Sequence, residues 1–367
     1  MKINLIFFCA NFTRGGAGNS IIRLCKKLNT KKYQISIICL NKFSYLKEIK
    51  NTRIKIFKIN KSKVIFSIFE IRSILLKTIK QSSKNIFISN LNYANALSIL
   101  FFRKLDYLKI ILVERTPLRE LDIYRSFMDF LKKNIIKFLI KTFYKNSNKV
   151  VCNSKYMSND FFRRYGIKSQ TINPPSLLKY INNLKNKNYN KKKTLKIITI
   201  SRLSYEKNLE ILIKSLSMLK FKNFELTICG SGNDENKLKN LSEKFGLKKK
   251  IKFTGYLKKV DFYLKQSHLY INSSLFEGFP NSVVEAINYN LPIISSQSFG
   301  GINDILPNKN YGTILNNFNE SSLSRTIELF YNNPNIFYKK SGLAKKNIIN
   351  FSLNNNVKKY DNLFTKI

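Results

Sequence analysis

The sequence is poor in the residues that metal sites need. It has one histidine, His268, and its five cysteines show no C-x-x-C spacing, so we expect no zinc site. Most cysteines stand inside apolar runs such as Ile37–Leu40, which predicts buried free thiols in a reducing compartment. No run approaches about eighteen uninterrupted apolar residues, so we expect no membrane-spanning helix. The short apolar run Ile3–Ala10 indicates a first core strand and not a signal peptide.

Acidic residues are also scarce. The chain has 21 Asp and Glu against 66 Lys and Arg, a net charge of +45. Three interpretations compete: nucleic-acid binding, attraction to an anionic membrane and phosphate-bearing substrates, and a general compositional bias. Lysine is spread along the chain without Arg-rich or RNA-motif patches, which favours the last two. We therefore expect no nucleic-acid partner.

Apolar strand-like runs alternate with helical patterns from end to end. This alternation predicts an α/β protein with parallel sheets, and 367 residues suffice for two domains. A run dense in Asn and Lys, Lys179–Lys193, is the most plausible linker between two Rossmann-like domains that face a central cleft. The expected strands are Ile3–Cys9, Gln34–Leu40, Lys55–Ile59, Ile86–Ser89, Ile110–Val113, Lys149–Cys152 and Gln170–Ile172 before the linker, then Leu195–Ser201, Glu225–Cys229, Ile251–Phe253, Leu269–Asn272, Pro292–Ser295 and Gly312–Leu315.

The segment Phe276–Ala286 holds two carboxylates, Glu277 and Glu285, around a bend and a helix start. Ligands bind at the carboxyl ends of parallel strands, and a short buried strand runs into this segment. Asn281 or Ser282 can cap the helix, and backbone N–H groups of the bend can hold an anion. The arrangement suits a nucleoside diphosphate; the alternative is a pair of surface glutamates around a helix start.

Two cations stand in the loop after the first strand of the second domain. Arg202 and Lys207 are five residues apart and can clamp a diphosphate from one loop. Alternatively, they are two solvated cations in a very basic chain. Glycine turns follow other strands, at Asn11–Gly18, Cys229–Gly232 and Phe253–Leu257, and each is either a close approach to a ligand or only a tight turn.

These motifs resemble those of the retaining glycosyltransferases of family 4, which have the GT-B fold. Glu277 and Glu285, with Gly278-Phe279-Pro280-Asn281 after the first, match the E-x7-E motif, and Arg202 with Lys207 matches the R-x4-K element. The resemblance covers nearly the whole chain and is most specific from Ile197 to Leu315.

The resemblance implies a role for each site residue. Glu277, Arg202 and Lys207 are the implied catalytic residues: Glu277 orients the donor sugar, and the two cations neutralise the leaving diphosphate. Glu285 is implied to hold the ribose. The other implied donor-binding residues are Gly278, Phe279, Pro280, Asn281, Ser282, Gly15, Gly16, Gly230, Gly232 and Leu257. Gly300–Asp304 is similar to a further family loop, G-G-x-x-E, but has Asp304 in place of Glu, and we interpret it as a structural loop.

The acceptor side departs from the family pattern. Many members carry a histidine in the first domain, and this chain has none there; Asn90 or Asn92 is the implied substitute. Val113–Pro117 resembles the S-E-R-N-x-P element of enzymes that extend lipid-linked bacterial glycans, one residue shorter, which makes Glu114 and Arg115 acceptor-binding candidates. We interpret His268, which precedes an apolar strand, as structural.

A basic helical stretch runs from Leu118 to Asn148. Apolar residues recur there at three- and four-residue spacing, and the lysines, among them Lys133, Lys137 and Lys141, form a cationic face. Either the helix packs on the sheet like any other, or the face lies against anionic lipid.

Together these features predict an acceptor-binding domain at 1–175, with a terminal helix at 354–367 that crosses back to it, and a donor-binding domain at 176–353. The resemblance implies a retaining glycosyltransferase that moves a hexose or N-acetylhexosamine from a nucleotide diphosphate sugar, UDP-linked by expectation, to a lipid-linked acceptor. The pathway would be bacterial surface polysaccharide assembly, such as O-antigen or capsule, on the inner face of the plasma membrane. We expect no cofactor and no metal. The alternative is a catalytically silent glycan-binding subunit, which would lose the charged site residues.

Overall fold

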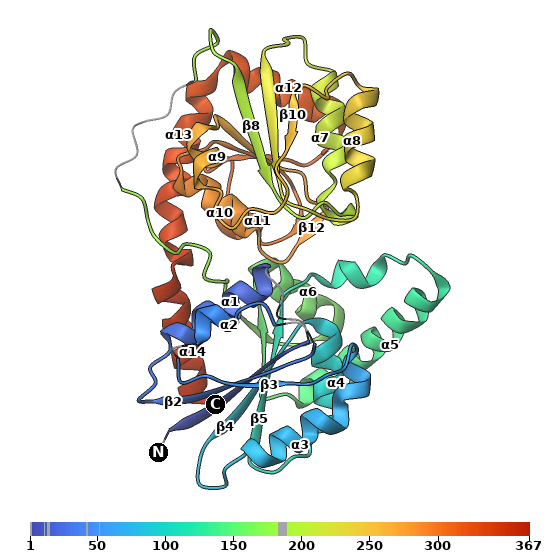
Figure 1. Cartoon of the computed structure of the whole chain (residues 1–367), viewed down its shortest axis with the longest axis vertical. Coiled ribbons are helices and arrows are strands. Elements are labelled where there is room, and N and C mark those ends of the chain that lie inside the picture. The colour runs from blue at the N-terminus through green and yellow to red at the C-terminus, as the bar shows by residue number, and fades with distance from the viewer. Residues whose placement is uncertain (1, 11, 13–14, 42, 51, 183–188) are drawn as a thin grey trace. The chain divides into compact units, whose positions relative to one another are not determined.

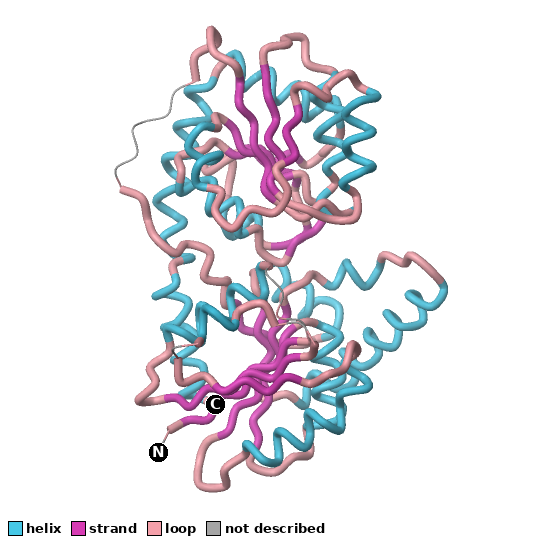
Figure 2. Tube along the Cα trace, in the orientation of Figure 1, coloured by secondary structure: helices cyan, strands magenta, loops and turns pink. Residues whose placement is uncertain are grey.

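The computed structural model describes residues 2–10, 12, 15–41, 43–50, 52–182 and 189–367. The expected linker Lys179–Lys193 therefore lies partly outside the described residues. The chain divides into two compact units, one made of Met1–Pro175 and Leu353–Ile367 and the other of Ser176–Ser352 (Figure 1). Each unit is a parallel sheet between layers of helices (Figure 2).

Unit 1 is built on a seven-stranded sheet in the order β3-β2-β1-β4-β5-β6-β7. Its strands are β1 (Ile3–Cys9), β2 (Tyr33–Cys39), β3 (Lys55–Lys58), β4 (Asn85–Asn90), β5 (Leu108–Glu114), β6 (Lys149–Cys152) and β7 (Ser169–Thr171). All neighbours pair in parallel. The expected strands of this half are confirmed to within two residues at their ends.

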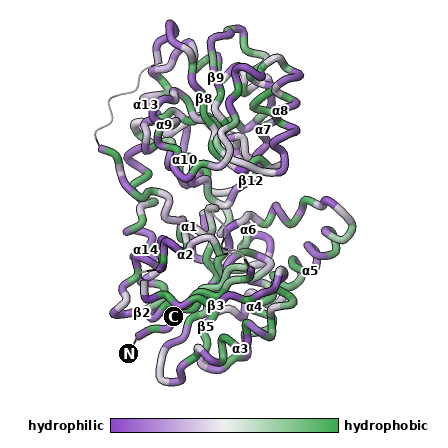
Figure 3. The backbone as a smooth tube through the Cα atoms, viewed as in Figure 1, coloured by the Kyte–Doolittle hydropathy of each residue, from purple (hydrophilic) through white to green (hydrophobic). Residues whose placement is uncertain are grey.

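Helices cover both faces of the sheet of unit 1. They are α1 (Gly16–Lys27), α2 (Leu46–Ile49), α3 (Ile68–Thr78), α4 (Asn92–Phe102), α5 (Phe127–Phe143), α6 (Lys155–Tyr165) and α14 (Leu353–Lys366), with 3-10 turns η1 (Val64–Ser67), η2 (Leu118–Asp122) and η3 (Tyr144–Asn146). One core joins the sheet to α3, α4, α5 and α6. A second core, on the other face, joins it to α1, α2 and α14. Central strands that are buried on both faces are predominantly apolar, with few polar positions such as Asn4 of β1, which is why they carry long hydrophobic runs (Figure 3).

The C-terminal helix α14 belongs to the core of unit 1. The Phe364 ring is fully buried and lies 6.3 Å from the Phe7 ring and 6.0 Å from the Tyr33 ring, between centroids. Asp361 of the same helix accepts hydrogen bonds from Lys32 at 2.8 Å and from Tyr33 at 2.6 Å. The last residues of the chain therefore complete a hydrophobic core that its first residues begin.

Unit 2 has a six-stranded parallel sheet in the order β10-β9-β8-β11-β13-β15. Its strands are β8 (Leu195–Ile200), β9 (Phe224–Cys229), β10 (Ile251–Phe253), β11 (Leu269–Asn272), β13 (Ile293–Ser296) and β15 (Thr313–Leu315). The helices are α7 (Leu209–Ser217), α8 (Glu235–Lys244), α9 (Asp261–Gln266), α10 (Asn281–Asn288), α11 (Ile302–Ile305), α12 (Glu320–Asn332) and α13 (Pro334–Asn347), with 3-10 turns η4 (Tyr205–Lys207) and η5 (Ile348–Phe351). The α/β class with two Rossmann-like parallel-sheet domains is confirmed.

The sequence did not predict a second, small sheet in unit 2. Strands β12 (Phe276–Glu277) and β14 (Phe299–Gly300) pair in parallel, with Glu277 opposite Gly300. Each is two residues long, too short for any periodicity to indicate it. This pairing joins the segment of Glu277 to the loop that follows β13.

Truncation of Phe364 tests the role of α14. Phe364→Ala should lower the free energy of unfolding of unit 1 by about 3–5 kcal/mol, because it empties a fully buried aromatic site. Phe262→Ala is a matched control, since that ring on α9 is 62% exposed and its loss should change little. Urea denaturation followed by circular dichroism measures both, and equal midpoints for the two variants would show that α14 does not stabilise the unit.

Candidate active site

The candidate residues of unit 2 gather at the point where the order of its strands reverses. Strands β8 and β11 are neighbours in the sheet, and the connections lead away from them in opposite directions. Parallel α/β sheets bind ligands beside the carboxyl ends of such strands. The loop after β8 carries Arg202 and Lys207, and the loop after β11 leads to Glu277. The topology thus brings together residues that are about 70 positions apart in sequence.

An ion pair joins these two loops. Lys207 Nζ lies 2.9 Å from Glu277 Oε1, and the two side chains are only 10% and 20% exposed. The other carboxylate oxygen of Glu277 lies 3.2 Å from the Ser274 hydroxyl. A lysine ammonium has three N–H donors, so the contact with Glu277 leaves further donors on Lys207.

Short polar side chains fix the backbone around this pair. The Ser273 hydroxyl donates to the carbonyl of Lys207 at 2.6 Å, and the backbone N–H of Leu275 donates to the carbonyl of Glu206 at 2.8 Å. The Ser296 hydroxyl, on β13, donates to the carbonyl of Ser274. Three neighbouring segments are therefore tied together behind the charged side chains, which limits how far Lys207 and Glu277 can separate.

Arg202 is oriented by a residue that the sequence did not single out. Its guanidinium is 77% exposed and lies 2.9 Å from Glu206 Oε1, which also accepts from the Ser204 hydroxyl at 2.7 Å. Burial acts to raise the pKa of Glu206, but the hydrogen bonds of Ser204 and of the backbone, together with the charges of Arg202 and Lys207, outweigh it and lower the pKa. Glu206 thus stays ionised between the two cations. The sequence signal for this role was the position of Glu206 between Arg202 and Lys207 in the R-x4-K element.

Helix α10 carries Glu285 and begins at Asn281, one or two residues earlier than we expected. Its N-cap is Pro280, without a side-chain cap, so Asn281 and Ser282 are helical and the predicted capping is wrong. The Asn281 side chain instead accepts a hydrogen bond from Ser176, and Ser282 accepts one from the Tyr270 hydroxyl at 2.8 Å. Glu285 is half-buried on the second turn of the helix.

The bend before α10 offers fewer free groups than we expected. The Asn281 N–H donates to the carbonyl of Phe279 at 3.0 Å, so it is already engaged. The Phe279 ring is buried and lies 5.0 Å from the Phe351 ring, so the side chain stabilises the fold and only its backbone can meet a ligand. Gly278 and Pro280 are buried beside it.

Three glycines of unit 2 lie directly against protein backbone. A Cβ on Gly230 would lie 1.8 Å from the Ser201 carbonyl oxygen, and one on Gly232 would lie 2.2 Å from that of Leu203. A Cβ on Gly300 would lie 1.5 Å from the carbonyl oxygen of Glu277. Gly230 and Gly232 thus let neighbouring loops approach the loop that carries Arg202, and their expected contact with a ligand stays a prediction. Leu257 is half-buried and packs against the core of unit 2.

In unit 1 the corresponding strand reversal lies between β1 and β4. Gly15 is the N-cap of α1 and Gly16 its first residue. The preceding Asn11, Thr13 and Arg14, which belong to the expected glycine loop, lie outside the described residues. Asn92 begins α4 and is half-buried.

Two of the acceptor-side candidates are buried and serve as supports. The Asn90 amide donates to the carbonyl of Phe8 at 3.0 Å and accepts from Arg115 Nε at 2.9 Å. Asn90 has no exposed surface, so our expectation that it contacts an acceptor is corrected: it orients Arg115, which is half-buried.

Glu114 is the second buried candidate. One oxygen accepts from Tyr144 at 2.7 Å and from Asn95 at 2.8 Å, and the other has no hydrogen-bond partner. Burial raises the pKa of Glu114 to about 7, although the hydrogen bonds from Tyr144 and Asn95 act to lower it. Since Glu114 has no exposed surface, it does not meet an acceptor directly.

The outward cationic face that we expected on α5 is present only in part: Lys132 and Lys141 are exposed, but two other lysines are paired with aspartates. Lys133 pairs with Asp129 at 2.8 Å, and Lys137 pairs with Asp122 at 2.8 Å, so both charges are partly compensated. The outward surface of α5 also carries exposed large apolar side chains, which are Phe127, Met128, Phe130, Leu131, Ile135 and Phe138. Three other residues, Ile136, Leu139 and Ile140, pack on the sheet. The helix is therefore apolar on two sides.

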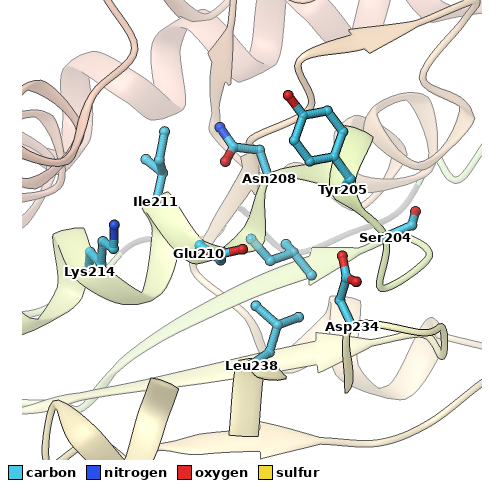
Figure 4. A pocket seen from close by; sticks show the side chains of 9 residues that line it. Ser204, Tyr205, Asn208, Glu210, Ile211, Lys214, Asp234 and Leu238 are labelled. Atoms are coloured by element: carbon cyan, nitrogen blue, oxygen red, sulfur yellow. The ribbon is translucent and has the colours of Figure 1, made fainter. Parts of the chain in front are cut away.

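A cavity of about 220 Å³ lies beside the loop of Arg202, between α7 and the start of α8 (Figure 4). Its lining residues are Ser204, Tyr205, Asn208, Leu209, Glu210, Ile211, Lys214, Asp234 and Leu238. It shares Ser204 with the charged site but is not lined by Glu277 or Lys207. The paired charges therefore lie next to this cavity and not inside it.

The remaining polar residues have structural surroundings. His268 Nδ1 accepts from the backbone N–H of Lys196 at 3.0 Å, and its ring lies 5.1 Å from that of Tyr189. All five cysteines are buried free thiols, as expected. Within the described ranges, His, Cys, Asp and Glu side chains form no group of three or more that could hold a metal ion. Among the helices that the structure describes, none combines the length and apolarity needed to cross a bilayer.

Two family models match the chain. The model described as Glycosyltransferase Family 4 matches residues 14–174, and the model described as Glycosyl transferases group 1 matches residues 181–348. Together they cover nearly all of both units.

Individual relatives agree with these models. A Haemophilus influenzae protein described as an uncharacterized glycosyltransferase is 28% identical over 151 residues, which are 41% of this chain and 43% of that protein. The chain thus matches less than half the length of that relative. A Campylobacter jejuni protein, GalNAc-alpha-(1->4)-GalNAc-alpha-(1->3)-diNAcBac-PP-undecaprenol alpha-1,4-N-acetyl-D-galactosaminyltransferase, is 24% identical over 364 residues, which are 96% of this chain and 95% of that protein.

A solved structure shares the fold over the whole chain. The Anabaena protein HepE in complex with UDP-glucose superimposes with a TM-score of 0.79 at 13% identity and covers 100% of both chains. The expected GT-B fold class is confirmed.

Substitution of Gly300 tests the small sheet. Gly300→Ala should destabilise unit 2 by about 1–3 kcal/mol, because the new Cβ would overlap the Glu277 carbonyl and force β12 from β14. Gly342→Ala, in the interior of α13 with no atom within 4 Å of the added Cβ, should be neutral or stabilising. Urea denaturation compares the two variants. Equal stabilities would mean that the close approach of Gly300 to Glu277 is not required.

Proposed function

The chain belongs to the glycosyltransferases of the family 4 type, and we propose that it transfers one sugar from a nucleotide diphosphate donor to an acceptor hydroxyl with retention of anomeric configuration. One observation carries the proposal: the part-buried pair of Lys207 and Glu277, 2.9 Å apart at the carboxyl ends of β8 and β11. Arg202 lies on the loop after β8, and Glu285 lies on the helix that follows Glu277.

The cations act on the leaving group. As the bond between sugar and diphosphate breaks, negative charge develops on the diphosphate, and Arg202 and Lys207 stabilise it. Lys207 keeps its contact with Glu277 through one N–H and offers the others to phosphate oxygens. Attack by the acceptor on the same face lets the departing diphosphate take the acceptor proton. The cations of the protein supply the charge stabilisation, so we propose that no metal is required.

The carboxylates act on the donor. Glu277 is held between Lys207 and Ser274, so its free lone pairs can accept hydrogen bonds from the sugar hydroxyls and set the sugar's orientation. Glu285 binds the ribose hydroxyls. Backbone amides between Phe279 and Ser282 that the bend does not already engage would meet the diphosphate or sugar, and backbone groups near Leu257 would meet the base.

The donor is a UDP-linked hexose or N-acetylhexosamine, and the acceptor is a lipid-linked saccharide. The HepE complex with UDP-glucose supports the first part, and the undecaprenol-linked substrate named for the Campylobacter relative supports the second. Asn92 and Arg115 would contact the acceptor, with Asn90 and Glu114 behind them as positioning residues. The product would enter bacterial surface polysaccharide assembly, such as O-antigen or capsule.

The enzyme works on the inner face of the plasma membrane as a peripheral protein. The exposed apolar side chains of α5 support this location, since a helix with apolar residues outward and lysines beside them suits the interface of an anionic bilayer. The acceptor's lipid would then lie in the same surface.

A donor screen tests the function. Released nucleoside diphosphate is measured with a panel of nucleotide sugars and lipid-linked acceptors, with EDTA or with Mg²⁺, and the anomeric configuration of the product is read by NMR. We expect turnover with a UDP-sugar, retention, and activity that survives EDTA. Glycan binding without turnover of any donor would favour the catalytically silent subunit. Loss of activity with EDTA that Mg²⁺ restores would contradict the metal-free mechanism.

Substitutions of the two glutamates should affect different quantities. Glu277→Gln should lower kcat by about a hundredfold, because the carboxylate that orients the sugar and pairs with Lys207 is lost. Glu285→Gln should weaken nucleotide binding by about 2 kcal/mol, or about thirtyfold, through lost ribose contacts.

Steady-state kinetics and calorimetry with UDP separate these effects. Glu243→Gln, an exposed glutamate on α8 that pairs with Lys248, is the matched control and should change neither quantity. Normal turnover of a folded Glu277→Gln variant would remove Glu277 from the mechanism.

Membrane binding should depend on the apolar side chains of α5 more than on its paired lysines. Replacing Phe127, Ile135 and Phe138 by Ser should lower binding to anionic vesicles by about a hundredfold, at about 1 kcal/mol of lost burial each. Replacing Lys133 and Lys137 by Gln should have a smaller effect, because both are paired with aspartates. Vesicle sedimentation measures both variants. Equal sedimentation of the apolar variant and the parent would show that α5 does not dock.

A further inference from the structure

A second helix of unit 1 has an unpartnered apolar surface. The segment η1–α3, Val64–Thr78, packs on the sheet through Val64, Ile68, Ile71 and Leu75. Its opposite side exposes Ile65, Phe66, Phe69 and Leu76, and we call these four residues the α3 stripe. Phe69 is 84% exposed and Phe66 is 64% exposed. Single exposed apolar residues are ordinary, but two phenylalanines side by side at helical spacing form a patch that water disfavours.

Cations surround the α3 stripe. Arg72 and Lys77 are exposed on the same segment, and Lys63, exposed directly before it, has its Nζ 5.7 Å from the centroid of the Phe66 ring. The acid of this helix, Glu70, lies 3.9 Å from Lys61 and adds little negative charge to the surface. Aromatic side chains on the outer face with Lys and Arg beside them are typical of helices that lie in the interface of an anionic bilayer.

The α3 stripe and α5 lie over the same face of the sheet of unit 1. Helices α3, α4 and α5 cover the same face of the sheet, and α4 packs against both of the others (Figure 1). Phe101, near the C-terminal end of α4, is also exposed. Each of these three helices thus exposes large apolar side chains.

The charge of the chain selects among possible occupants. A second copy would bring two basic surfaces together at a net charge of +45 each, which repels. Single-stranded nucleic acid would use the cations and could stack on Phe66 and Phe69, but it would gain nothing from the aliphatic Ile65 and Leu76 of the stripe. An anionic lipid surface satisfies both the apolar residues and the cations.

We propose that the α3 stripe is a second membrane-docking element, which inserts Phe66 and Phe69 into an anionic bilayer beside α5. This rests on the proposed function only for the existence of a membrane partner, and not on sugar transfer. Two separated docking helices would fix the orientation of unit 1 on the bilayer, which a single helix cannot do because the protein could rotate about its axis.

The absence of tryptophan from the chain gives a direct test. Phe69→Trp places one fluorophore on the stripe, and Phe262→Trp, at a 62% exposed site on α9 of unit 2, is the matched control. Each variant is mixed with phosphatidylcholine–phosphatidylglycerol vesicles, with and without brominated acyl chains, and with pure phosphatidylcholine vesicles. We expect a blue shift and bromine quenching for Phe69→Trp with the anionic vesicles, weaker signals with the neutral ones, and no change for Phe262→Trp.

Two results would overturn the proposal. One is an emission of Phe69→Trp that stays water-like while the protein sediments with the vesicles, since binding would then use α5 alone. The other is a blue shift without vesicles that grows with protein concentration, which would identify a second copy as the occupant.

A second variant pair separates the proposal from sugar transfer. Phe66→Ser with Phe69→Ser should weaken vesicle binding by about a hundredfold, while transfer to a water-soluble acceptor stays unchanged. Phe262→Ser is the control and should bind as the parent does. Unchanged vesicle binding by the stripe variant would contradict the proposal and leave the transferase activity untouched. Absent transfer in the parent would contradict only the proposed function.

Discussion

The ion pair between Lys207 and Glu277 is the contact on which the candidate site depends. It joins the loops that follow two neighbouring strands, β8 and β11, at the point where the strand order of unit 2 reverses. The hydrogen bond from Ser273 to the Lys207 carbonyl, the pairing of β12 with β14, and the glycine at position 300 all hold these loops in place. Because the ammonium and the carboxylate are held in contact, the two side chains have little freedom to move. Electrostatic catalysis requires such preorganised charges.

Unit 1 differs from unit 2 in what lies at its strand reversal and on its outer helices. Its polar candidates support other groups: Asn90 hydrogen-bonds to Arg115, and Tyr144 and Asn95 hydrogen-bond to Glu114. The side chains of Asn90 and Glu114 are fully buried. Its outer helices have apolar residues outward. Unit 2 concentrates paired charge at the carboxyl ends of its strands. This division is consistent with the proposed function, in which unit 2 binds the nucleotide sugar and unit 1 binds the acceptor.

Most of the fold could be predicted from the sequence, because parallel strands buried on both faces need continuous apolar runs and helices need their own period. The β12–β14 pairing could not, since two residues carry no period and their partner is far along the chain. The partners of individual side chains could not be predicted from the sequence either. The spacing of α5 predicted a cationic outer face, but Asp122 and Asp129 pair with two of its lysines. The motif gave Arg202 and Lys207 but not the role of Glu206 between them, which only the folded loop reveals.

A double-mutant cycle on kcat tests most directly whether the pair of Lys207 and Glu277 acts as one unit in catalysis. Lys207→Ala, Glu277→Ala and the double variant are compared with the parent for release of nucleoside diphosphate, at saturating donor and acceptor. The account predicts that the double variant is little worse than either single one, because each change already disables the pair. Fully additive losses, or a folded double variant with normal kcat, would contradict it.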